Sequence, residues 1–127
     1  MAIKFKSIEK GEPGVKGGGK KKFYASPVSN GEADLDQITR SIEKTCTVSG
    51  ADIRAVLYAM VETIDDMLAD GKIVRLGELG SLRVSFGSSG HETEKEVNAK
   101  SVTSSKVLFT PGKMIKKMLG SLDFKKA

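Results

Sequence analysis

The sequence holds no tryptophan, a single cysteine and a single histidine, and it contains no long apolar run. Cys46 cannot form a disulfide within the chain, so we expect a small, buried or half-buried hydrophobic side chain in a reducing compartment. No segment approaches the roughly twenty apolar residues of a membrane span, and no apolar run follows the N-terminal lysines as a signal peptide requires. These absences predict a cytoplasmic protein without a membrane partner.

Side chains suited to catalysis or metal binding are equally scarce. His91 lies in a stretch of Gly, Ser and Glu that indicates a solvated loop, and one histidine with one cysteine does not make a structural zinc site. No signature of a serine nucleophile with its base and oxyanion hole is present. Residues 14–20 have the spacing G-x-x-x-x-G-K, but Lys21 replaces the Ser or Thr that binds Mg²⁺ in a phosphate-binding loop. We therefore expect no enzyme, no cofactor, no metal and no small-molecule substrate.

Charge, in contrast, is abundant and unevenly distributed, with a net charge of +5. Residues 1–30 hold seven lysines and two glutamates, residues 31–70 hold three basic and nine acidic side chains, and residues 71–127 hold eleven basic and five acidic ones. Two basic zones thus flank an acidic zone. Such clustering fits a polyanion partner, because neutralised phosphates release condensed counterions. A solvated surface with an incidental positive excess also explains it.

The acidic zone predicts two helices. The first, from about residue 34 to residue 44, places three apolar side chains on one face: Leu35, Ile38 and Ile42. The second has strong end signals, with Ser49 as the N-cap, Asp52 three residues later and Gly71 just past the end. Its apolar face comprises Ile53, Val56, Leu57, Met60, Val61, Ile64, Met67 and Leu68. Because one protomer has too little apolar surface to cover this face, we predict a homodimer.

Strands are expected on both sides of these helices. After Gly71, strands at 73–76 and 81–86 are joined by Gly-Glu-Leu-Gly, and a third strand lies at about 106–110. Near the N-terminus, residues 3–8 alternate apolar and polar side chains, and residues 23–25 form a second short strand. The Gly- and Lys-rich residues between those two strands are expected to be a mobile loop.

A short basic helix is predicted to begin with Pro111 in its first turn and to end at Gly120. Its three lysines share one side of the helix, because they follow the spacing i, i+3 and i+4: Lys113, Lys116 and Lys117. Exposed backbone N–H groups in the first turns also favour an anion. The helix therefore suits a DNA phosphate, although surface lysines that keep a helix soluble have the same pattern.

From about Asp34 to Leu119, some two thirds of the chain, the sequence resembles the HU/integration host factor family of bacterial histone-like proteins. The hairpin from Val74 to Val84, which follows the helix ending at Gly71, stands in place of the family's glycine-containing hairpin. The sequence Phe-Thr-Pro-Gly-Lys at 109–113 matches the family's F-x-P-G-K element. The resemblance implies an α+β fold and an intertwined homodimer, with a helical body and a three-stranded antiparallel β-sheet saddle. The resemblance further implies two β-arms that extend from the saddle and embrace the DNA minor groove.

The resemblance also implies a function, namely non-enzymatic and largely sequence-independent binding of double-stranded DNA in the bacterial nucleoid, with DNA condensation. Lys113 and Lys116 match lysines of the family that contact phosphates. The candidate DNA-binding residues lie on the saddle strands, beside the third strand, in the basic helix and in the N-terminal loop: Arg75, Arg83, Lys100, Lys106, Lys113, Lys116, Lys117, Lys20, Lys21 and Lys22.

The sequence departs from the family pattern in two places. Residues 85–98 lack the arginines and the proline of the family's arm and carry three acids instead: Glu92, Glu94 and Glu96. Residues 1–30 form a basic β/loop extension that precedes the HU-like domain of residues 31–127, and its strands and lysines are candidates to extend the sheet and to add charge. An HU fold that has lost DNA binding and serves as a structural or protein-interaction module is the alternative.

Overall fold

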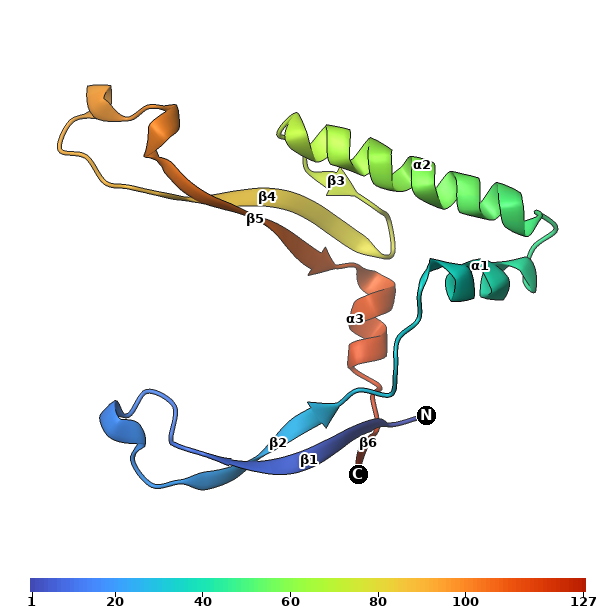
Figure 1. Cartoon of the computed structure of the whole chain (residues 1–127), viewed down its shortest axis with the longest axis horizontal. Coiled ribbons are helices and arrows are strands. Elements are labelled where there is room, and N and C mark those ends of the chain that lie inside the picture. The colour runs from blue at the N-terminus through green and yellow to red at the C-terminus, as the bar shows by residue number, and fades with distance from the viewer.

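Two antiparallel hairpins project toward the same side of the molecule in the computed structural model, which describes residues 1–127 (Figure 1). One hairpin is built by the N-terminal residues and the other by the segment after the long helix, and helix α3 lies between their bases. The elements in chain order are β1 (Ile3–Lys10), β2 (Lys22–Val28), α1 (Leu35–Glu43), α2 (Gly50–Ala69), β3 (Val74–Arg75), β4 (Gly80–Ser88), β5 (Val102–Pro111), α3 (Lys113–Leu119) and β6 (Phe124–Lys126). Three short 3₁₀ turns lie in the loops of the hairpins: Lys16–Gly18, Glu94–Glu96 and Ala99–Ser101.

The two central helices begin and end where their capping signals predict. The Asp34 side chain accepts a hydrogen bond from the backbone N–H of Gln37 at 2.9 Å, and Ser49 accepts one from that of Asp52 at 3.3 Å. Gly71 has a φ of 82°, the left-handed conformation of a helix C-terminal glycine. The expectation of a buried or half-buried Cys46 is wrong. This cysteine is exposed because it lies in the turn between α1 and α2, which no other element covers.

The saddle sheet has the expected antiparallel order β3-β4-β5. Its first strand is only two residues long, and its third strand starts four residues earlier than predicted. The prediction that Pro111 opens a helix is wrong, since this residue ends β5 opposite Gly80, and α3 begins at Lys113. Proline is tolerated there because β5 is an edge strand.

The N-terminal extension does not enlarge the saddle but forms a sheet of its own, with the order β2-β1-β6. Strands β1 and β2 are antiparallel, and β6 adds to β1 in the parallel direction. Strand β6 was not expected from the sequence. The carbonyl of Asp123 accepts a hydrogen bond from the N–H of Ile3 at 2.8 Å, which starts this pairing. The two ends of the chain therefore meet in one sheet, as Figure 1 shows.

The chain buries very little of its own surface. Five of 127 residues are buried, and the only large apolar side chains among them are Ile53 of α2 and Val74 of β3. The accessible surface is 10775 Å², whereas a compact folded chain of 13.6 kDa exposes about 6,600 Å². Many large apolar side chains are consequently left in contact with solvent.

Candidate nucleic-acid interface

Three of the candidate DNA-binding residues share one face of the saddle sheet. Residues 81, 83 and 85 are alternate positions of β4. Strand pairing places Arg75 of β3 opposite Ser81 and Lys106 of β5 opposite Ser85. Side chains alternate between the two faces of a sheet, so Arg75, Arg83 and Lys106 project to the same side. We call these three residues the basic face of the saddle. All three are exposed, and no acidic residue of β3, β4 or β5 shares that face.

The opposite face of the saddle sheet is apolar. Its side chains come from all three strands: Val74, Leu82, Val84, Phe86, Val107 and Phe109. Helix α2 lies against the end of the sheet where Val74 is 7% exposed. Toward the arm, in contrast, Phe86 remains 61% exposed and Val107 55% exposed. A sheet with one basic and one apolar face requires that the apolar face be covered from elsewhere if it is to be stable.

The lysines of α3 are held close to the end of the saddle. The backbone N–H of Gly112, the N-cap of α3, donates to the carbonyl of Leu79 in the β3–β4 turn at 2.9 Å. Lys113, Lys116 and Lys117 follow on one side of this helix, and all three are exposed. The fold thus positions them next to the strand that carries Lys106.

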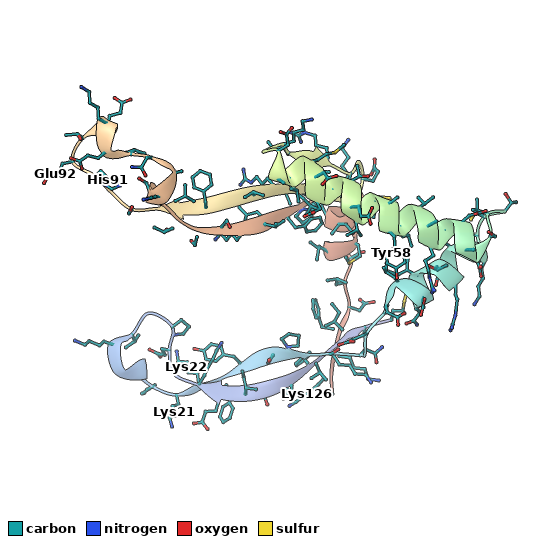
Figure 2. The ribbon with its side chains drawn as sticks, turned by 45° about the horizontal axis from the view of Figure 1, so that its top comes forward. Lys21, Lys22, Tyr58, His91, Glu92 and Lys126 are labelled. Atoms are coloured by element: carbon teal, nitrogen blue, oxygen red, sulfur yellow. The ribbon has the colours of Figure 1, made fainter.

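The remaining candidate lysines lie apart from the saddle's basic face. Lys20, Lys21 and Lys22 belong to the N-terminal hairpin, where Lys21 and Lys22 project to opposite sides of the strand (Figure 2). The Nζ of Lys22 lies 3.0 Å from Oε1 of Glu12, so this lysine already has an acidic partner. Lys100 is exposed in the last 3₁₀ turn of the arm tip.

The arm tip, residues 89–101, is exposed as expected except at Ser101, and internal hydrogen bonds hold it together. His91, labelled with Glu92 at the tip in Figure 2, has a side chain only 28% exposed. Its Nε2 lies 2.9 Å from the hydroxyl oxygen of Ser101, which also accepts from the backbone N–H of Asn98 at 3.0 Å. His91 therefore has a structural role at the tip, a role that its position in the sequence did not reveal.

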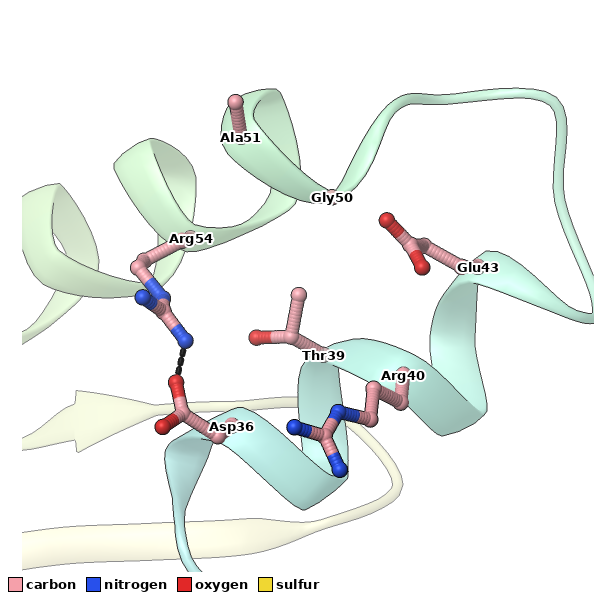
Figure 3. Close-up of a pocket in the computed structure, with 7 residues that line it drawn as sticks. All are labelled: Asp36, Thr39, Arg40, Glu43, Gly50, Ala51 and Arg54. Carbon is pink, nitrogen blue, oxygen red and sulfur yellow. Dashed lines mark ion pairs between the residues drawn. The ribbon is translucent and has the colours of Figure 1, made fainter.

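The largest cavity lies between α1 and α2 and has a volume of about 530 Å³. It is lined mainly by polar side chains, and an ion pair between Asp36 of α1 and Arg54 of α2 crosses it (Figure 3). Arg40 and Glu43 complete the charged lining. These charged side chains link the two helices. The structure has no cluster of His, Cys, Asp or Glu side chains able to hold a metal ion, and no helix long and apolar enough to cross a membrane.

Comparisons with known proteins agree on the type of fold. The model of a family described as "HU domain fused to wHTH, Ig, or Glycine-rich motif" matches residues 1–126. The crystal structure of a proposed bacterial DNA-binding protein from Bacteroides vulgatus is similar with a TM-score of 0.63 and 19% sequence identity, over 96% of this chain and 47% of that one. The chain thus spans about half the length of that structure. No curated protein matches the chain significantly.

Proposed function

The chain belongs to the family of HU domains fused to winged helix-turn-helix, immunoglobulin-like or glycine-rich parts, and from this premise we propose that it binds double-stranded DNA without enzymatic activity. The observation that carries the proposal is the basic face of the saddle. Arg75, Arg83 and Lys106 project from three neighbouring strands with no acidic residue among them. Guanidinium and ammonium groups arranged in this way suit the phosphate backbone of a duplex.

The lysines of α3 extend this surface. Lys113, Lys116 and Lys117 stand on one side of a helix whose N-cap is hydrogen-bonded to the saddle turn. Contacts to phosphates fix a protein on the duplex but carry no sequence information. Binding is therefore proposed to be largely independent of sequence, as in an architectural protein of the nucleoid. Lys20, Lys21, Lys22 and Lys100 are proposed as weaker, peripheral contacts.

We also propose that the DNA-binding form is a homodimer. The accessible surface of one chain exceeds that of a compact chain of this mass by about 4,200 Å². Each partner of an obligate dimer commonly loses roughly 1,000–2,500 Å², so the chain has ample surface for such an interface. On α2, part of the apolar face remains uncovered at Val56, Met60 and Met67, which are 66%, 42% and 41% exposed. The apolar face of the saddle is uncovered toward the arm as well. A second copy of the chain has the matching apolar surface for both regions.

A titration of duplex DNA with the whole chain, at low and at moderate salt, tests this proposal. Two duplexes of unrelated sequence should bind with similar affinity at low salt, and both should lose affinity steeply as salt rises. An absence of binding at low salt would contradict the proposed function.

The arm tip favours one alternative, an HU-fold module that contacts proteins instead of DNA. Glu92, Glu94 and Glu96 are exposed at the place where an arm would approach the duplex, and like charges repel phosphates. The same titration separates the two functions, because a protein-interaction module would bind neither duplex.

A further inference from the structure

The N-terminal sheet has two chemically different faces, which the pairing of its three strands defines. On one face lie Lys4, Lys6, Ile8 and Lys10 of β1, Lys22, Tyr24, Ser26 and Val28 of β2, and Lys125 of β6. We call this the lysine face. The other face carries mainly apolar side chains, among them Ile3, Phe5, Phe23, Ala25, Pro27 and Phe124. No acidic residue of the three strands belongs to the lysine face.

Lysines on this face stand directly beside one another. Lys10 is opposite Lys22 across the β1–β2 ladder, and Lys4 is opposite Lys125 across the β1–β6 ladder. Like charges directly opposite in a sheet are destabilising. Only Lys22 has an ion-pair partner, Glu12, while the ammonium of Lys10 lies 5.0 Å above the ring centre of Tyr24. The positive charge of the face is therefore largely uncompensated within the chain.

The spacing of these lysines suits an extended polyanion. Lys4 and Lys10 are six residues apart on one strand, which corresponds to about 20 Å at ~3.4 Å per residue. A duplex rises about 20 Å over six base pairs and presents one phosphate per ~3.4 Å on each strand. A row of ammonium groups of this length can reach several phosphates of one duplex. A small anion would need only one or two of them.

We propose that the lysine face binds the phosphate backbone of duplex DNA, as a second surface separate from the basic face of the saddle. The inference rests on the proposed function, because it assumes that the chain meets DNA. It adds Lys4, Lys6, Lys10 and Lys125 to the contacts, none of which was a candidate from the sequence alone. The sequence does show lysines at alternate positions of β1. The pairing of β1 with β2 and β6 was needed to show that Lys22 and Lys125 lie on the same face.

Two variants of the full chain with equal reduction of charge test the inference. The first combines Lys4→Gln, Lys6→Gln and Lys10→Gln. The matched control combines Lys44→Gln, Lys72→Gln and Lys126→Gln, of which Lys126 lies on the opposite face of the same sheet. The slope of log affinity against log salt should become shallower by about 1 for each phosphate that the first variant no longer neutralises. In the control it should stay within about 1 of the unchanged chain.

A second measurement does not depend on how the variants fold. Lysine acetylation of the unchanged chain, read by mass spectrometry with and without duplex DNA, should show several-fold protection of Lys4, Lys6 and Lys10 but not of Lys44 and Lys72. Failure of the unchanged chain to bind DNA would contradict the proposed function itself. Binding that depends on Lys113, Lys116 and Lys117, with no protection of the lysine face and equal slopes for both variants, would overturn this inference alone. Protection by anionic lipid vesicles in place of DNA would also overturn it.

Discussion

The backbone N–H of Gly112 donates a hydrogen bond to the carbonyl oxygen of Leu79 at 2.9 Å. This bond joins the glycine-containing hairpin to the Phe-Thr-Pro-Gly-Lys element, two segments separated by the whole arm. The approach is so close that a Cβ on Gly112 would collide with the backbone of Glu78 and Gly80. The close approach of the β3–β4 turn therefore requires a glycine at position 112. The same contact places the α3 lysines beside the saddle.

Replacement of Gly112 should therefore weaken the fold. Gly112→Ala forces the turn and the start of α3 apart, and we expect the free energy of unfolding to fall by about 2 kcal/mol. Gly120→Ala is the matched control, because Gly120 has a helical φ of −74° and its added Cβ meets only ordinary contacts at 3.6 Å and beyond. Urea denaturation of both variants measures the difference. Equal stability of the two would show that the contact at Gly112 is not tight.

Removal of charge from the saddle's basic face should weaken DNA binding through its salt dependence. For the double variant Arg83→Gln and Lys106→Gln, the salt slope should become shallower by about 1 per phosphate contact and therefore by about 4 in a dimer. The variant Lys44→Gln and Lys72→Gln removes the same charge from sites away from this face and should leave the slope nearly unchanged. Fluorescence anisotropy at four or more salt concentrations measures both slopes. Identical slopes would mean that Arg83 and Lys106 do not contact phosphates.

The lysines of α3 should contribute to affinity without contributing to specificity. Replacement of Lys113, Lys116 and Lys117 by Ala should weaken binding to all duplexes by the same factor, because phosphate contacts carry no base information. Competition between duplexes of different sequence measures this factor. A weakening confined to one sequence would indicate base contacts from α3. An unchanged affinity for every duplex would place the helix away from the DNA.

The exposed apolar strip of α2 should hold the dimer together. Val56→Asp combined with Met60→Asp puts charge into the proposed interface. The mass measured by light scattering should therefore fall from about 27 kDa, twice the chain mass of 13.6 kDa, toward that of one chain, or the chain should unfold. Ala55→Asp introduces one such charge on the side of the helix away from the apolar strip and should leave the dimer intact. Monomeric behaviour of the unchanged chain at micromolar concentration would contradict the dimer.

The helices could be predicted from sequence because their signals are local. Ser49 and Gly71 mark the ends of α2 through their own backbone conformations, and the expected boundaries agree with the structure to within a residue or two. Pro111 was placed wrongly because a proline fits both the first turn of a helix and the end of an edge strand. Only the pairing of Pro111 with Gly80 decides between the two.

The faces of both sheets could not be predicted, because a shift of one residue in register moves every side chain to the other face. The sequence placed Arg75 and Arg83 on saddle strands but could not say that Lys106 joins them. Strand β6 was missed for a related reason. Its three residues, Phe124–Lys126, have no pattern of their own and become a strand only by pairing with β1 at the other end of the chain.

The central claim, that this chain binds DNA mainly through its phosphates, is tested most directly by the salt slope of the unchanged chain on a duplex of arbitrary sequence. If about half of the six basic side chains of the saddle face and α3 contact phosphates in each copy of a dimer, these contacts alone give log affinity against log salt a slope of about −5, and contacts from the lysine face make the slope steeper. A slope near zero, or no binding at low salt, would contradict the claim.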